Sequence, residues 1–135
     1  MLAQNFKTAA ELGLDQPSYD AHVKVLHALE RGEMIHTKIE RHYDGTYLIE
    51  PQVPNGFNMG PRSYVCNSGT CRCILGWADV YTEGGKVNLS TKPMTPSQAD
   101  AYARLVNPNN ANDRTVDEAA HALRTYLVTG EAEWA

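Results

Sequence analysis

The chain has 135 residues, of which 42% are hydrophobic and 21% are charged, which is typical of one folded domain and argues against global disorder. The formal net charge of −4 excludes the cationic excess with which proteins bind nucleic acid or anionic membranes. The N-terminus lacks the pattern of a signal peptide, no apolar run is long enough to span a membrane, and the three cysteines are an odd number. We therefore expect a single globular domain, residues 1–135, in the cytoplasm, without membrane association or cofactor.

Two helices are predicted before residue 32. The shorter covers residues 8–12 and ends before Gly13. The longer covers residues 18–31, where Ser18 can cap the start and Gly32 can end the last turn. Apolar residues recur along the longer helix at a helical spacing, which predicts one buried face.

Residues 34–50 are predicted to form a β-hairpin, because an Asp-Gly pair at 44–45 separates two β-rich runs. A two-residue loop would place Ile39 opposite Glu50. A three-residue loop that includes the preceding tyrosine places Ile39 opposite Ile49 and pairs opposite charges. We therefore predict the register of the three-residue loop.

Residues 51–69 contain three prolines and three glycines, which predicts a long loop rather than a helix or strand. Long loops in compact domains are uncommon and often functional. We expect Phe57, Met59 and Tyr64 to attach this loop to the core. A short strand over 86–89 is a further prediction.

Residues 71–82 are predicted to form a helix that Thr70 caps. Apolar residues surround most of its circumference, which is typical of a helix that is buried on several sides. We therefore expect this helix to lie at the centre of the fold.

Two more helices are predicted in the last third of the chain. Thr95 and Gln98 form a capping box at the start of the first, which is expected to end near Val106. Thr115 and Glu118 form a second capping box. The second helix should end before residue 130 and bury an apolar stripe of Val116, Ala119, Ala120, Leu123, Tyr126 and Leu127.

All three cysteines lie between residues 66 and 73, and they have three interpretations. As buried residues they would act as small apolar groups of the central helix. As an alternative, Cys71 could be a nucleophile at a helix N-terminus, where the dipole stabilises a thiolate. Such an enzyme needs a base, for which the chain offers His22, His27, His36, His42 and His121.

A metal site would use Cys66, Cys71 and Cys73. Structural zinc sites prefer two-residue gaps between their cysteines, whereas the gaps here are four residues and one residue. Two cysteines two positions apart on a helix also point about 200° apart, from the 3.6-residue turn. The burial interpretation is therefore the one that we adopt.

The acidic residues gather towards the C-terminus. Residues 107–135 contain five acidic and two basic groups, a net charge of −3, whereas residues 1–106 contain eleven acidic and ten basic groups, a net charge of −1. Such residues can be a solvated helix face or a surface that docks a basic partner. The candidate partner-binding residues are Asp113, Asp117, Glu118, Glu131 and Glu133.

The segment Gly69-Thr70-x-x-Cys73-x-x-Gly76-Trp77-Ala78 resembles a motif of short uncharacterised proteins of phages and bacteria, Cys-Gly-Thr-x-x-Cys-x-x-Gly-Trp-Ala. The likeness spans roughly residues 57–135, from the Asn-Met pair at 58–59 to the Thr-Gly-Glu-Ala-Glu-Trp tail. Ser68 replaces the first cysteine of the motif, which speaks against a thiol site built on a cysteine pair.

These observations predict an α+β fold of about four helices and a hairpin. The resemblance implies a small phage-type, non-catalytic inhibitor that occupies a surface of a host protein. An anti-defence, anti-CRISPR-like role would match an acidic surface to a basic cleft that normally takes nucleic acid. The alternative is a small cysteine-dependent enzyme that uses Cys71.

Overall fold

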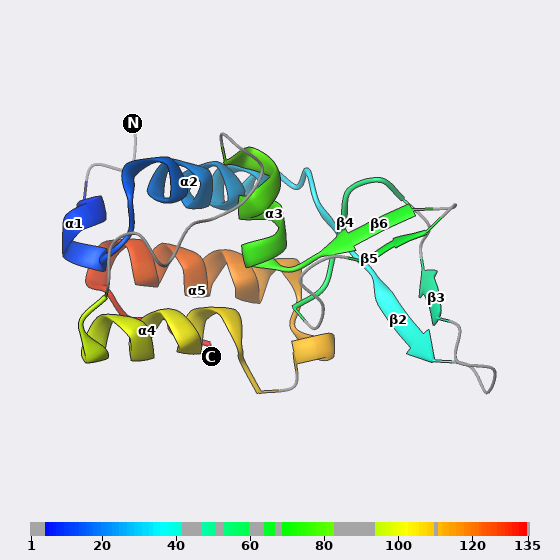
Figure 1. Ribbon diagram of the computed structural model, residues 1–135. Helices are drawn as coiled ribbons and strands as arrows, with labels where there is room; N and C mark the ends of the chain where they lie inside the picture. Colours follow the sequence, from blue (N-terminus) through cyan, green and yellow to red (C-terminus); the bar gives the residue numbers. More distant parts are fainter. Residues whose placement is uncertain are drawn as a thin grey trace.

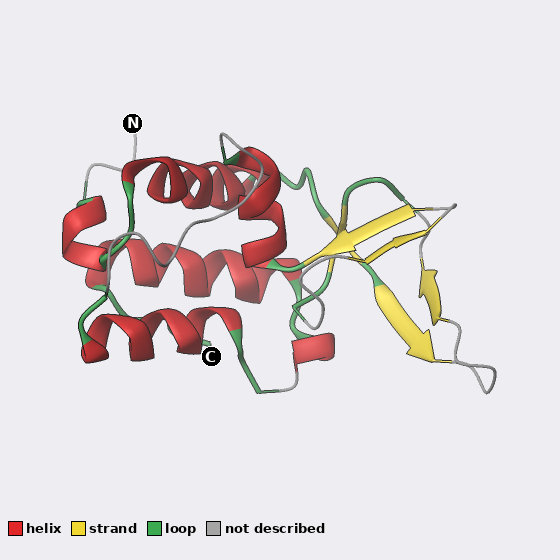
Figure 2. Ribbon diagram, viewed as in Figure 1, coloured by secondary structure: helices red, strands yellow, loops and turns green. Residues whose placement is uncertain are grey.

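The structure is a computed structural model that describes residues 5–41, 47–50, 53–59, 64–66, 69–82, 94–109 and 111–134. It is a single small α+β domain, with the helices gathered on one side and short strands on the other (Figures 1 and 2). We call the helices together the helical body and residues 35–72 the strand region. The helices are α1 (Ala9–Leu12), α2 (Gln16–Glu30), α3 (Ile74–Tyr81), α4 (Pro96–Val106) and α5 (Val116–Thr129), with a 3-10 turn η1 (Ala111–Asp113).

The N-terminal helices end where the sequence predicts, but α2 begins earlier. Gly13 follows α1, and Gly32 follows α2 with a positive φ of 72°. The cap of α2 is Asp15, whose carboxylate accepts a hydrogen bond from the backbone N–H of Ser18. The prediction of Ser18 as the cap was therefore wrong, because Asp15 followed by Gln-Pro gives an earlier start with proline in the first turn.

The strands form two small sheets. One sheet has the order β1-β4-β6-β5, in which β4 is parallel to both β1 and β6 and β5 is antiparallel to β6. The other is the hairpin of β2 and β3. The strands are β1 (Ile35–His36), β2 (Lys38–Arg41), β3 (Tyr47–Glu50), β4 (Gly56–Phe57), β5 (Tyr64–Cys66) and β6 (Gly69–Arg72).

The predicted hairpin register is confirmed. Ile39 pairs with Ile49, Lys38 with Glu50, and the remaining pairs follow in the same register. The turn itself, residues 42–46, lies outside the described residues. The hairpin is shorter than predicted, because Ile35 and His36 form β1 of the other sheet.

Residues 51–69 are not one continuous loop. They contain β4 and β5, so the prediction of a loop throughout was wrong. Phe57 and Met59 are buried, as predicted for residues that attach the segment to the core, whereas the side chain of Tyr64 lies outside the description. Asn58 is also buried, and its side-chain N–H donates to the backbone oxygen of Thr37 at 2.8 Å. The short strand predicted over 86–89 lies outside the described residues.

The helix predicted over 71–82 begins three residues later. Cys71 lies in β6, opposite Gly56 on one side and Tyr64 on the other. Cys73 caps α3 in place of Thr70, with its sulfur accepting from the Gly76 N–H at 3.4 Å. The ladder bonds of β6 hold these residues extended, a long-range effect that helical periodicity does not report.

The C-terminal helices form as predicted. Both capping boxes are present, Thr95 with Gln98 and Thr115 with Glu118, and the helices end at Val106 and Thr129. In α5 most of the predicted apolar stripe is buried, but Val116 and Ala120 are only partly covered. Ala122, which the prediction did not include, is buried as well.

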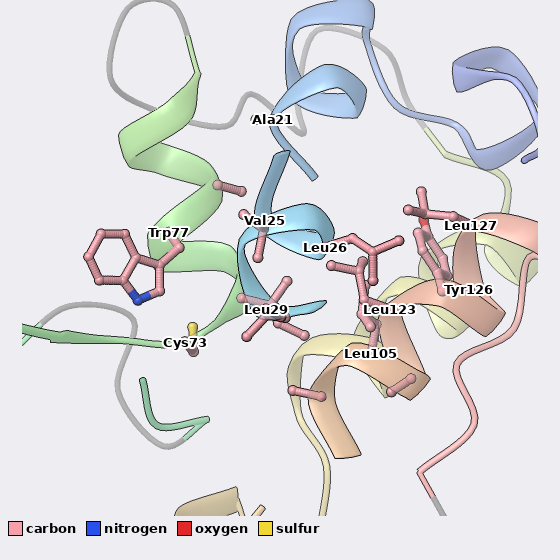
Figure 3. Packing of buried hydrophobic residues seen from close by; sticks show 14 of the residues in the cluster. Ala21, Val25, Leu26, Leu29, Cys73, Trp77, Leu105, Leu123, Tyr126 and Leu127 are labelled. Atoms are coloured by element: carbon pink, nitrogen blue, oxygen red, sulfur yellow. The ribbon is translucent and has the colours of Figure 1, made fainter. Parts of the chain in front are cut away.

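The core centres on α2 rather than on α3. Figure 3 shows Val25, Leu26 and Leu29 of α2 between Trp77 of α3 and Leu123 of α5. Helix α3 buries Ile74, Gly76, Trp77 and Ala78 but leaves Val80 47% exposed. The prediction of residues 71–82 as the central helix was therefore wrong, since α3 covers one side of α2 and α5 the other.

Candidate functional site

The C-terminal tail folds back onto the helical body. The Trp134 indole N–H donates to the backbone oxygen of Arg104 at 2.9 Å. The Arg114 guanidinium lies 5.4 Å from the centroid of the Trp134 ring, which places a cation over the aromatic face. The backbone N–H of Glu133 donates to the Thr125 hydroxyl at 2.9 Å. These contacts fix the tail against α4 and α5.

The fold brings four of the five candidate carboxylates towards the start of α5. Asp117 and Glu118 lie in the first turn of α5, and Asp113 ends η1 just before it. Glu133 contacts His121 at 3.0 Å, and His121 lies one helical turn after Asp117. The returning tail therefore places a carboxylate that is distant in sequence beside the first turn of α5.

The fifth carboxylate, Glu131, lies on the α4 side of the tail. Its Oε1 accepts from the Arg104 guanidinium at 2.7 Å. We define the C-terminal surface as the five candidate carboxylates, the basic side chains beside them, and the Trp134 ring that contacts Arg114. Its residues are Arg104, Asp113, Arg114, Asp117, Glu118, His121, Glu131, Glu133 and Trp134.

The carboxylates of the C-terminal surface differ in what they already bind. Glu118 accepts from the Thr115 backbone N–H at 2.9 Å and lies 3.5 Å from the Arg114 guanidinium. Together these contacts lower the pKa of Glu118, and the hydrogen bond from the Thr115 backbone has the largest effect. Asp113 and Asp117 are exposed, and neither forms an ion pair with another residue that the structure describes. The uncompensated charge therefore lies at Asp113 and Asp117.

A cavity of about 330 Å³ opens beside the tail. Its lining includes Arg104, Asn107, Asn109, Arg114 and Trp134. The sequence analysis did not select the two arginines, because a net-charge count treats them only as a reduction of acidity. Their pairing with Trp134 across 20 to 30 positions has no local sequence signal.

Cys71 does not lie at the helix N-terminus where the nucleophile interpretation placed it. It lies in β6 rather than in the first turn of α3. The dipole of α3 acts at its first turn, which begins at Ile74, so it does not provide the thiolate stabilisation that was predicted for Cys71. Cys73 is 4% exposed and caps α3. This position agrees with the burial interpretation for Cys73. The side chains of Cys66 and Cys71 lie outside the description.

No metal-ligand cluster occurs among the described side chains, which include Cys73 but not the other two cysteines. The helices that the structure describes also include none with the length and apolar character of a membrane span.

His22, one of the candidate bases, is a buried residue. It is 0% exposed, its Nδ1–H donates to the Ser18 carbonyl at 2.7 Å, and its Nε2 lies 2.8 Å from the Tyr102 hydroxyl. Since a carbonyl can only accept, the imidazole is neutral when the Tyr102 O–H donates to Nε2. Burial lowers the pKa of His22, and the Ser18 bond opposes this only in part. The arrangement joins α2 to α4 and is structural.

The chain matched no protein-family model, and searches of curated proteins and of solved structures found no significant match. The likeness to phage and bacterial proteins therefore stays a prediction.

Proposed function

We propose that this protein is a small phage-type, non-catalytic binding protein that acts in the host cytoplasm by occupying a surface of a host protein. The partner that fits best has a basic cleft of the kind that binds nucleic acid, which would make the protein an anti-defence inhibitor. The observation that carries the proposal is the C-terminal surface, where carboxylates from η1, the first turn of α5 and the folded tail lie near the Trp134 side of Arg114 and near His121.

The chemistry of this surface suits recognition of a cationic protein. Asp113 and Asp117 offer uncompensated charge, Glu131 is held in place by an ion pair with Arg104, and Glu133 is held by a hydrogen bond with His121. Preorganised charges of one sign steer an oppositely charged partner and give specificity. Trp134 supplies an aromatic group beside them, a residue type that is enriched among the dominant contacts of interfaces.

The test compares two charge-neutral double variants. Asp113→Asn with Asp117→Asn removes the uncompensated pair, whereas Asp20→Asn with Asp100→Asn removes two exposed carboxylates from α2 and α4. Tagged protein is used to capture partners from host extract, and the affinity of each purified partner is then measured at low and at moderate salt. The first variant should weaken binding about tenfold, from about 0.7 kcal/mol per rim charge.

The control double variant should bind like the wild type, and excess duplex DNA should compete with the wild type for the partner. Equal affinity of the two variants, or binding that DNA does not affect, contradicts the proposal.

A further inference from the structure

A second cavity, of about 170 Å³, lies where α1, the start of α4 and the end of α5 meet. In Figure 1 these three helix ends lie together, at the end of the helical body that is opposite the strands. The polar groups around the cavity include those of Lys7, Glu11, Ser97, Gln98, Tyr126 and Glu131. Only Glu131 is shared with the C-terminal surface.

Tyr126 gives this cavity an unused hydrogen-bonding group. The residue is 1% exposed, and its hydroxyl has no hydrogen-bond partner among the described residues. Buried hydroxyl groups in proteins are nearly always paired with protein or with a bound molecule. Burial raises the pKa of Tyr126, so the hydroxyl keeps its proton and can donate it. The hydroxyl itself exposes less than 1 Å², so an acceptor oxygen of a ligand would satisfy it once the side chains that cover it shift.

Charges of both signs surround the same cavity. Lys7 supplies an ammonium group, while Glu11 and Glu131 supply carboxylates. Each carboxylate already accepts one bond, Glu11 from the Thr8 N–H at 2.8 Å and Glu131 from Arg104 at 2.7 Å. An ionised carboxylate has about four acceptor positions, so both can accept more.

These charges restrict the ligand. A purely anionic molecule would face two carboxylates, and a purely cationic one would face Lys7. The volume of about 170 Å³ is below the ~300 Å³ of a pocket for drug-sized ligands. The ligand is therefore small and carries both signs.

We propose that this cavity binds a small zwitterion of the size of a free α-amino acid. Its carboxylate lies towards Lys7 and the Tyr126 hydroxyl, and its ammonium group lies towards Glu11 and Glu131. The binding requires no partner protein, so it is independent of the function proposed for the C-terminal surface.

The test is an NMR titration of the isotope-labelled full chain with glycine, L-serine, L-threonine and L-glutamine at millimolar concentrations. At least one of them should cause saturable shifts of the backbone amides of Ser97, Gln98 and Gly130. Acetate and methylamine, which carry one charge each, should bind much more weakly.

Tyr126→Phe should weaken the binding about fivefold to tenfold, as expected for one lost hydrogen bond. This variant removes an unpartnered hydroxyl, so the spectrum should show an intact fold. Tyr19→Phe removes a hydroxyl from α2 outside the cavity and should bind like the wild type. Lys7→Gln should weaken binding of the amino acid. Lys24 lies on α2 outside the cavity, so the control variant Lys24→Gln should bind like the wild type.

Three results would overturn the proposal. The first is the absence of saturable shifts with all four amino acids, as for a cavity that holds water alone. The second is equal affinity of wild type and Tyr126→Phe. The third is binding of acetate or methylamine as strong as that of the amino acids.

Discussion

The helices α2, α4 and α5 each carry their own start and stop signals, whereas β1 and β4 pair only with strands that are distant in sequence. Thr95 and Gln98 begin α4 through bonds that span three residues. By contrast, the two-residue strand β4 lies between β1 and β6, which precede and follow it by 15 to 21 positions. The comparison shows that the helical body is encoded locally and that the parallel pairs of the strand region depend on assembly.

The two regions meet at α3 and the segment just before it. The Trp77 indole N–H of α3 donates to the Gly56 backbone oxygen of β4 at 2.9 Å. Cys73 ends the extended segment and caps the helix that follows. The motif residues that resemble phage and bacterial proteins therefore lie where the strand region meets the helical body.

The largest predicted effect tests whether the stability of the helical body comes from its buried core rather than from its exposed faces. Leu123 is 0% exposed in the core, so Leu123→Ala should lower the free energy of unfolding by about 2–5 kcal/mol through lost burial and a cavity. Val80 is 47% exposed on α3, so Val80→Ala should change it by less than about 0.5 kcal/mol. Urea denaturation with an unchanged slope measures both. Similar losses in the two variants would contradict this distribution of stability.

The next largest effect is a difference in unfolding free energy between two glycine variants. Gly13 lies between two helices of the helical body, and Gly32 lies where the chain leaves it for the strands. Gly13 and Gly32 have φ values of 79° and 72°, so alanine at either position should cost about 1 kcal/mol in backbone strain. A Cβ at Gly13 would lie 2.6 Å from Gln98 Oε1, whereas one at Gly32 would meet no atom within 4 Å.

Gln98 cannot move away from Gly13 without loss. Its Oε1 accepts from the Thr95 N–H at 2.8 Å, and its Nε2 donates to the Glu11 backbone oxygen at 3.0 Å. Gly13→Ala should therefore cost about 1 kcal/mol more than Gly32→Ala, the usual value of a helix cap. Thermal or urea unfolding measures the difference, and equal costs would show that Gln98 yields freely.

The smallest effect concerns pH and the buried His22. Its folded pKa is lowered from 6.5, chiefly by burial, so the unfolded chain binds a proton more readily. The stability contributed by neutral His22 is present above about pH 6.5 and is lost as the pH falls from there towards the folded pKa, by at most about 1.4 kcal/mol per pH unit.

The difference in unfolding free energy between wild type and His22→Gln should therefore shrink as the pH falls from about 7 to about 5. Urea denaturation at several pH values measures this difference. A constant difference over that range would show that His22 takes up its proton equally in the folded and unfolded states.

The sequence by itself determined the local structure of the helical body. Capping boxes, terminal glycines and apolar spacing act within a few residues, so the ends of α4 and α5 could be predicted from them. It also determined the hairpin register, because only one loop length pairs Ile39 with Ile49.

Only the tertiary structure decided the features that join distant segments. The parallel pairing of β4 turned residues 69–72 into a strand and moved the start of α3 past Cys71. The return of the tail set Trp134 against Arg114 and paired Glu133 with His121. The Tyr126 cavity exists because three helix ends meet there. Each of these depends on groups that are far apart along the chain, whose approach is set by packing of the whole core rather than by local propensity.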